Sequence, residues 1–144
     1  MDIVEHEGLA VHELAGIEHR TIAGLAHGLE TLDVWKQRLR PGSATPPHHH
    51  HCEEVVVVLA GQGVVEMNGN AREFAAGMSI VIPPGVPHRL VNNGSEDLEL
   101  LGVFGESPAR AFGADGQALA LPWDPPAFVP PGQMRAAASW RMYR

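Results

Sequence analysis

Short apolar runs, separated by glycine, proline and asparagine, recur along the middle of this chain. The run 31–40, "TLDVWKQRLR", carries β-branched and aromatic residues and stops at "PGS". The run 53–61, "EEVVVVLAG", is rich in valine and bounded by glycine, which favours a strand because β-branched side chains fit a pleated surface. In "GVVEMNGNAREF" (63–74) two short runs flank an Asn-Gly pair, which predicts a β-hairpin.

The same pattern continues toward the C-terminus. The stretch 77–93, "GMSIVIPPGVPHRLVNN", predicts a strand, a tight proline-glycine turn and a second strand, and "EDLELLGVFG" (96–105) predicts one more. Residues 1–30 show only irregular chain with short strands. Many short strands with frequent turns are typical of an all-β antiparallel sandwich or barrel.

The length of 144 residues suits a single domain covering residues 1–144. Sixteen glycines and twelve prolines favour turns and short strands over long helices. We expect a barrel core over about 31–105 and a C-terminal tail over 106–144. The tail has five prolines between Pro122 and Pro131, so we expect extended chain around the barrel, ending in a short helical piece.

Charge and cysteine content narrow the range of partners. The formal net charge of −7 argues against nucleic acid, because phosphate binding needs a basic face. The start "MDIVEHEGLAVHEL" lacks the pattern of a secretory signal, and the longest apolar run is too short to span a membrane. A single cysteine suits a reducing compartment. We therefore expect a cytoplasmic protein without a nucleic-acid or membrane partner.

Four consecutive histidines precede the valine run in "TPPHHHHCEE" (45–54). On a strand, residues of equal parity share a face, so His48, His50 and Glu54 point the same way. A straight strand would hold the last two about 13 Å apart at ~3.3 Å per residue, so one ion could be shared only if the chain bends between them. His88, the only histidine after the run, is the fourth candidate ligand. The opposite register, with the odd-numbered histidines and Glu53, is the rival.

These residues sit in two spaced patterns that resemble the sequence motifs of the cupin superfamily. The first is Gly42, five residues, His48, one, His50, three, Glu54, six, Gly61; the second is Gly77, five, Pro83, one, Gly85, two, His88, three, Asn92. The fifteen residues between the motifs are similar to the spacing of small bacterial single-domain cupins. The resemblance implies an antiparallel double-stranded β-helix, a jelly-roll barrel with a metal ion in its mouth.

By position, the resemblance makes His48, His50, Glu54 and His88 the metal ligands, and these donors suit iron, manganese, zinc or nickel alike. Other residues are candidates for the pocket wall: Trp35, Gln37, Cys52, Met67 and Leu90. Trp35 also suits ordinary core packing, and Cys52 suits a spare ligand, a redox-sensitive thiol or a lining side chain. We expect His49 and His51 to face away from the site, and the four histidines before residue 30 to lie at the surface.

No residue is assigned a catalytic role from the sequence. The first hypothesis is a metal-dependent enzyme, a dioxygenase-like oxidoreductase acting on a small organic molecule in the barrel. The alternatives are a non-catalytic module that binds a small ligand or metal, and a cupin isomerase. The resemblance also implies a homodimer that pairs through barrel edges.

Overall fold

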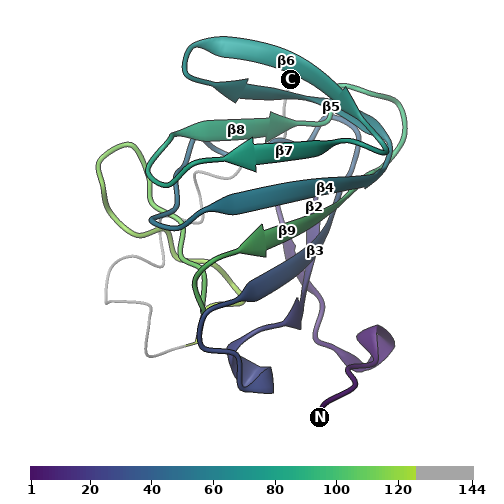
Figure 1. The fold of residues 1–144 in the computed structure, drawn as a ribbon. Helices are drawn as coiled ribbons and strands as arrows, with labels where there is room; N and C mark the ends of the chain where they lie inside the picture. The colour runs from purple at the N-terminus through teal and green to yellow at the C-terminus, as the bar shows by residue number, and fades with distance from the viewer. Residues whose placement is uncertain (126–144) are drawn as a thin grey trace.

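Two antiparallel β-sheets face each other in the computed structural model, which describes residues 1–125 (Figure 1). The larger sheet has six strands in the order β1-β2-β3-β9-β4-β7, and the smaller has three in the order β6-β5-β8. The strands are β1 His12–Leu14, β2 Ile17–Ala23, β3 Asp33–Leu39, β4 Glu54–Ala60, β5 Gln62–Met67, β6 Asn70–Ala75, β7 Ser79–Ile82, β8 His88–Val91 and β9 Leu98–Phe104. The predicted all-β class is confirmed; the helical elements of residues 1–125 are two single 3₁₀ turns, η1 (His6–Gly8) and η2 (Leu25–His27).

Each strand predicted from the apolar runs is present within a few residues of its expected bounds. The larger sheet also includes the hairpin of β1 and β2, which pairs onto β3, so the sheet begins well before residue 31. Of the predicted tail, 106–125 follows an irregular path. Residues 126–144, including the predicted helical end, lie outside the described residues. Within the described part, no helix is long and apolar enough to cross a bilayer.

Two turns need glycine for physical reasons. Asn68 and Gly69 both have positive φ, +53° and +73°, as a two-residue hairpin turn between β5 and β6 requires. Gly61, between β4 and β5, has φ +87°, and a Cβ there would lie 2.5 Å from the carbonyl oxygen of Asp97. Any other residue at 61 would therefore combine backbone strain with a collision.

The core fills the space between the two sheets. Alternation along β9 is regular: Leu98, Leu100, Gly102 and Phe104 are buried, and the residue between each pair is half-buried. The valine run follows the same rule, because Val56 and Val58 face the core while their neighbours face outward.

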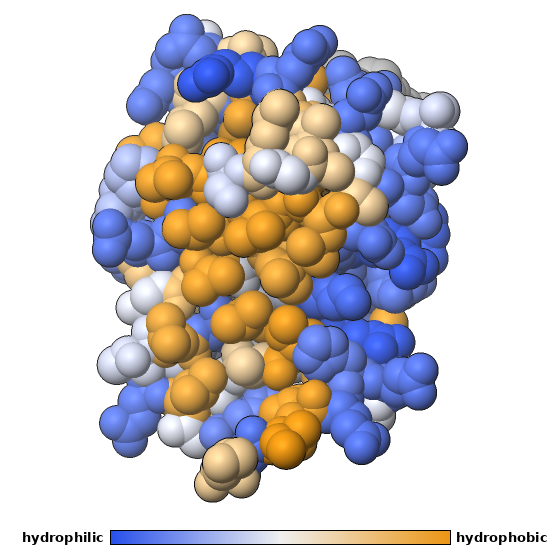
Figure 2. Space-filling model, turned by 45° about the vertical axis from the view of Figure 1, so that its right-hand side comes forward, coloured by the Kyte–Doolittle hydropathy of each residue, from blue (hydrophilic) through white to orange (hydrophobic). Residues whose placement is uncertain are grey.

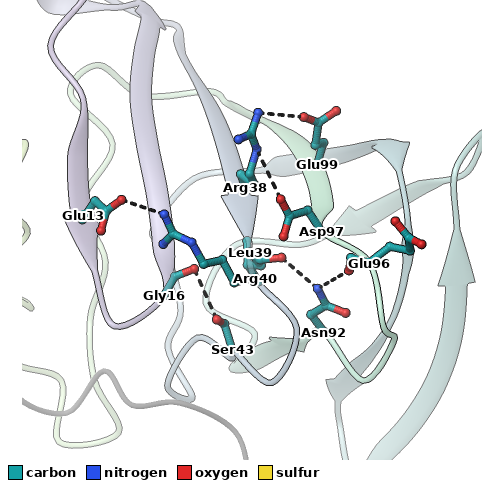
Figure 3. A network of polar contacts seen from close by, with 10 residues as sticks. All are labelled: Glu13, Gly16, Arg38, Leu39, Arg40, Ser43, Asn92, Glu96, Asp97 and Glu99. Carbon is teal, nitrogen blue, oxygen red and sulfur yellow. Dashed lines mark hydrogen bonds and ion pairs between the residues drawn. The ribbon is translucent and has the colours of Figure 1, made fainter.

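The end of the barrel where β8 finishes is fixed by Asn92 (Figure 3). Its amide nitrogen donates to the carbonyls of Leu39 (2.8 Å) and Glu96 (2.9 Å), and its Oδ1 accepts from the N–H of Gly94 (3.0 Å). This buried side chain thus joins the end of β3 to the β8–β9 turn. The ion pairs drawn beside it, such as Arg38 with Glu99, are exposed and contribute little to stability.

Candidate metal centre

The site lies at the opposite end of the barrel, where β4 and β8 begin. His48 pairs with His88, each accepting the other's backbone N–H at 3.0 and 2.8 Å, which brings the histidine run beside β8. The chain then bends at His51 and Cys52 before β4 starts at Glu54. The bend that the geometry of a shared ion requires is therefore present.

The structure brings together the four residues predicted as ligands. One nitrogen from each of His48, His50 and His88 lies within 4.8 Å of the other two. The Oε1 atom of Glu54 is 3.2 Å from Nε2 of His88 and 3.5 Å from Nε2 of His50. All four side chains are buried, with at most 6% of the residue exposed.

Backbone carbonyls fix the tautomer of each imidazole. The Nδ1–H of His48 donates to Pro46 at 2.7 Å, that of His50 donates to Arg110 at 2.7 Å, and that of His88 donates to Val86 at 3.0 Å. A carbonyl can only accept, so in each neutral ring the proton is on Nδ1 and Nε2 carries a lone pair. Metal-bound histidines usually have such a partner on the other ring nitrogen.

A cation fits the space between these groups. Nε2 of His50, Nε2 of His88 and Oε1 of Glu54 are buried and have no hydrogen-bond partner among the described residues. Burial lowers the pKa of His50 and, together with its neighbouring histidines, lowers that of His48 well below the usual value. Neutral rings leave lone pairs facing a carboxylate oxygen, an arrangement that a divalent metal satisfies. A divalent ion bound there would keep a net charge of +1.

The cavity beside the donors has a volume of about 20 Å³, enough for an ion or a water molecule. Among the predicted wall residues, Trp35, Gln37 and Leu90 line it. Met67 does not: it lies opposite His88 on β5 and lines a separate surface cavity of about 520 Å³, which His88 also borders.

Cys52 does not line the small cavity either. The bend turns its half-buried side chain against the hydrophobic core instead. Burial, with a smaller effect of Glu106, raises the pKa of its thiol to about 11. The thiol therefore stays protonated near neutral pH, which does not suit a reactive thiolate, and its position away from the small cavity does not suit a spare ligand.

His49 and His51 lie on the other side of the run and contact Phe112. His49 and Phe112 exchange backbone hydrogen bonds of 3.0 and 2.9 Å, and the ring of His51 stacks on Phe112 at 3.8 Å. The rival register of odd-numbered histidines with Glu53 is thus wrong, because these residues are not in the buried cluster. Instead they hold segment 105–125, which we call the covering segment, over the end of the barrel.

A further contact ties the covering segment to the site. Oδ2 of Asp33 accepts from the N–H of Ala109 at 2.9 Å, and the next carbonyl, that of Arg110, accepts from His50. Leu119 and Leu121 from the same segment are buried in the core. The covering segment therefore both closes the barrel end and orients one of the imidazoles.

His19 was wrongly expected at the surface. It is fully buried on β2, where Gln37 Nε2 donates to its Nδ1 at 2.9 Å and its Nε2 lies 2.8 Å from Thr21 Oγ1. The indole of Trp123 stacks on it at 3.6 Å, and Trp35 lies edge-on beside it. Burial lowers the pKa of His19 to about 2. Alternation from the buried Ile17 would have placed this side chain on the inner face.

Comparison with known proteins agrees with the fold. Residues 35–104 match the family model described as a cupin domain. Auxin-binding protein 1 of Arabidopsis thaliana is 40% identical over 67% of this chain and 54% of its own length. An auxin-binding protein of Nicotiana tabacum is 39% identical over 68% of this chain and 59% of its own length. The chain thus spans little more than half the length of these curated relatives.

A solved structure extends the similarity of fold to nearly the whole chain. The polyketide cyclase RemF of Streptomyces resistomycificus has a TM-score of 0.66 over 98% of this chain and 99% of its own. Its sequence identity is 24%, so this likeness concerns the fold alone.

Proposed function

Because this chain belongs to the cupin superfamily and carries a buried cluster of three imidazoles and a carboxylate, we propose that it binds a divalent transition metal. On that ion it would bind a small organic anion, which it releases without chemical change. The main evidence is that the centre contains buried donor atoms whose lone pairs have no hydrogen-bond partner among the described residues. Nε2 of His88 and Oε1 of Glu54 lie 3.2 Å apart with no proton between them in the neutral tautomer.

Charge favours an anionic ligand. Neutral imidazoles contribute no charge and Glu54 contributes −1, so a divalent ion leaves a net charge of +1 in a buried site. A carboxylate on the ligand would neutralise this charge. When bound, the ion supplies this Lewis-acidic anchor; the protein orients the imidazoles through the carbonyls described above and excludes water by burial.

The names of the relatives support binding as the function. The two described above are named as auxin-binding proteins, which suggests a small organic ligand of that kind for this chain. The 20 Å³ beside the donors cannot hold an organic molecule, whereas the surface cavity of about 520 Å³ that shares His88 falls within the range of small-molecule sites. We place the body of the ligand there, with its carboxylate toward the ion.

The first experiment measures metal and ligand together on protein purified without nickel resin. Elemental analysis should find one transition-metal ion per chain. Calorimetry with indole-3-acetate and benzoate should give binding at least about tenfold tighter in the zinc- or manganese-loaded protein than in the metal-free protein. Equal binding with and without metal, or a protein that retains no metal, would contradict the proposal.

Variants of the run itself supply the matched control. Replacing His50 or His88 by Ala removes a donor, and metal content should fall at least about tenfold. Replacing His51 by Phe removes an exposed imidazole of the same run but keeps a ring that can stack on Phe112, so metal content should not change. A similar loss in all three variants would mean that the run binds metal nonspecifically.

The dioxygenase and isomerase hypotheses remain predictions, and the same protein tests them. An iron-loaded sample with a bound ligand should not consume oxygen beyond one equivalent per chain. The ligand should be recovered unchanged after prolonged incubation. Repeated oxygen consumption, or an isomerised product, would replace binding by catalysis as the function of this site.

A further inference from the structure

A cavity of about 230 Å³ lies between the 3₁₀ turn η2 and the covering segment, and we call it the η2 cavity. It shares no lining residue with the metal centre or with the surface cavity beside His88. One side of the molecule is largely apolar (Figure 2), but apolar surface alone does not specify a ligand. The η2 cavity instead combines apolar walls with charged groups, which is the composition of a small-molecule site.

Two carboxylates line the η2 cavity: Asp33 from the start of β3 and Asp124 from the covering segment. Asp33 is only 3% exposed, and while its Oδ2 accepts from Ala109, its buried Oδ1 has no hydrogen-bond partner among residues 1–125. Asp124 is half-buried, and its Oδ2 accepts from the N–H of Leu121 at 3.2 Å. A buried carboxylate oxygen without a partner indicates that a donor is missing from this site.

The position of Oδ1 of Asp33 is set by Gly24. A Cβ at residue 24 would lie 2.6 Å from this oxygen and 3.0 Å from the Cγ2 atom of Thr21. Glycine therefore leaves Oδ1 on the side where Thr21 and the η2 turn form the wall of the cavity. Any side chain at 24 would have to displace the carboxylate.

The charge of the η2 cavity favours a cation. Burial raises the pKa of Asp124 to about 6, and the nearby Asp33 adds to this effect while Arg110 opposes it. Burial also raises the pKa of Asp33, although N–H groups around it and His27 act in the opposite direction. With a neutral imidazole at His27, two carboxylates and one guanidinium give a local charge of −1. A cation between the two carboxylates would stabilise both of them in the ionised form.

The walls indicate an organic cation and not a metal ion. Calcium and magnesium take six or more oxygen ligands, but the polar side chains of this lining are the two aspartates and Thr21, whose hydroxyl already contacts His19. The volume of about 230 Å³ is roughly eight times the ~30 Å³ of one water molecule in the liquid. The remaining side chains of the lining are apolar: Leu25, Ala26, Pro108, Ala109, Trp123 and Pro125.

We propose that the η2 cavity binds a small organic ammonium ion. Its N–H groups would donate to Asp33 and Asp124, and its apolar body would pack against Trp123 and the prolines. The net charge of −7 on the whole chain would attract such a cation from solution. This site does not depend on the metal centre, so either can be occupied without the other.

Calorimetry at pH 7.5 on the full chain, once zinc-loaded and once in EDTA, tests the proposal. The ligands are methyl-, butyl-, cyclohexyl- and benzylammonium, with benzyl alcohol as the neutral counterpart of the last. At least one ammonium ion should bind with a Kd below about 1 mM, equally well with and without zinc. Benzyl alcohol should bind at least about tenfold more weakly than benzylammonium.

Three variants with the same change of charge locate the site. Asp124→Asn keeps an acceptor for the N–H of Leu121 but loses the charge, so the Kd should rise at least about tenfold, and Asp33→Asn should have a similar effect. Asp115→Asn is the matched control, because Asp115 is an exposed residue of the same segment and lies outside the cavity; its Kd should equal that of the wild type.

Four results would overturn the proposal. They are a wild type that binds none of the four ammonium ions below about 10 mM, equal binding of benzyl alcohol and benzylammonium, binding that requires zinc, and an equal loss in Asp124→Asn and Asp115→Asn. The last would mean a general attraction to an acidic chain. Asp124 is half-buried, so its variant remains informative if Asp33→Asn does not fold.

Discussion

Protonation of His19 should make this protein less stable as the pH falls below 6.5. In the folded state its pKa is lowered to about 2 because the ring is buried, whereas in the unfolded chain it has the ordinary value of 6.5. The unfolded state thus binds a proton that the folded state does not bind. The stabilisation is fully present above pH 6.5 and decreases as the pH falls below it.

The size of the effect follows from the unfolded-state pKa. Between pH 8 and pH 5 the unfolded chain gains one proton on His19, and at pH 5 this is worth about 2 kcal/mol of unfolding free energy. The hydrogen bonds oppose protonation in the folded state as well, because the Nδ1 atom of His19 already accepts from the amide nitrogen of Gln37.

Urea unfolding at pH 8, 6.5 and 5, with EDTA present, measures this effect. The comparison is between the wild type and His19→Gln, which retains hydrogen-bonding groups for Thr21 and Gln37 but does not titrate. All other ionisable groups are present in both proteins, so their contribution cancels in the difference. The wild type should lose about 2 kcal/mol more than the variant between pH 8 and pH 5.

An equal loss in the two proteins, with equal m-values, would refute the reasoning. It would mean that His19 is protonated in the folded protein or is exposed to water. A His19→Gln variant that is less stable by the same amount at every pH would show a packing role and no linkage to protons.

Two other parts of the structure give predictions of similar size. Asp33→Ala leaves the buried N–H of Ala109 unpaired, so the unfolding free energy should fall by about 1–3 kcal/mol. Metal should also dissociate faster to a chelator in a stopped-flow experiment, because His50 loses its orienting segment. Asp33→Asn still offers an acceptor, so both the loss of stability and the faster dissociation should be smaller. Gly61→Ala should cost more stability in urea than Gly69→Ala, because both have positive φ but only at 61 would a Cβ collide with backbone; equal losses would contradict this.

The strands could be predicted from the sequence because they depend on local periodicity, whereas the four candidate donors were predicted from the resemblance to the cupin motifs. Alternation along the extended chain puts His48 and His50 on one side and His49 and His51 on the other, whatever the rest of the fold does. Gly61, which ends the valine run, has the positive φ that a turn there requires. These features are set within a few residues of the chain, so the printed sequence already contains them.

Alternation fixes which way a side chain points, but not what lies opposite it. Only the folded chain shows that His88 meets His48 across a bridge, that Trp123 covers His19, and that Phe112 holds the outer side of the histidine run. These contacts join segments between about 40 and 100 residues apart, so their partners depend on how the two sheets and the covering segment pack together. The sequence by itself determined the strands and, through the spacing of the cupin motifs, the candidate donors; the tertiary structure decided the burial of these donors, their protonation and the closure of the site.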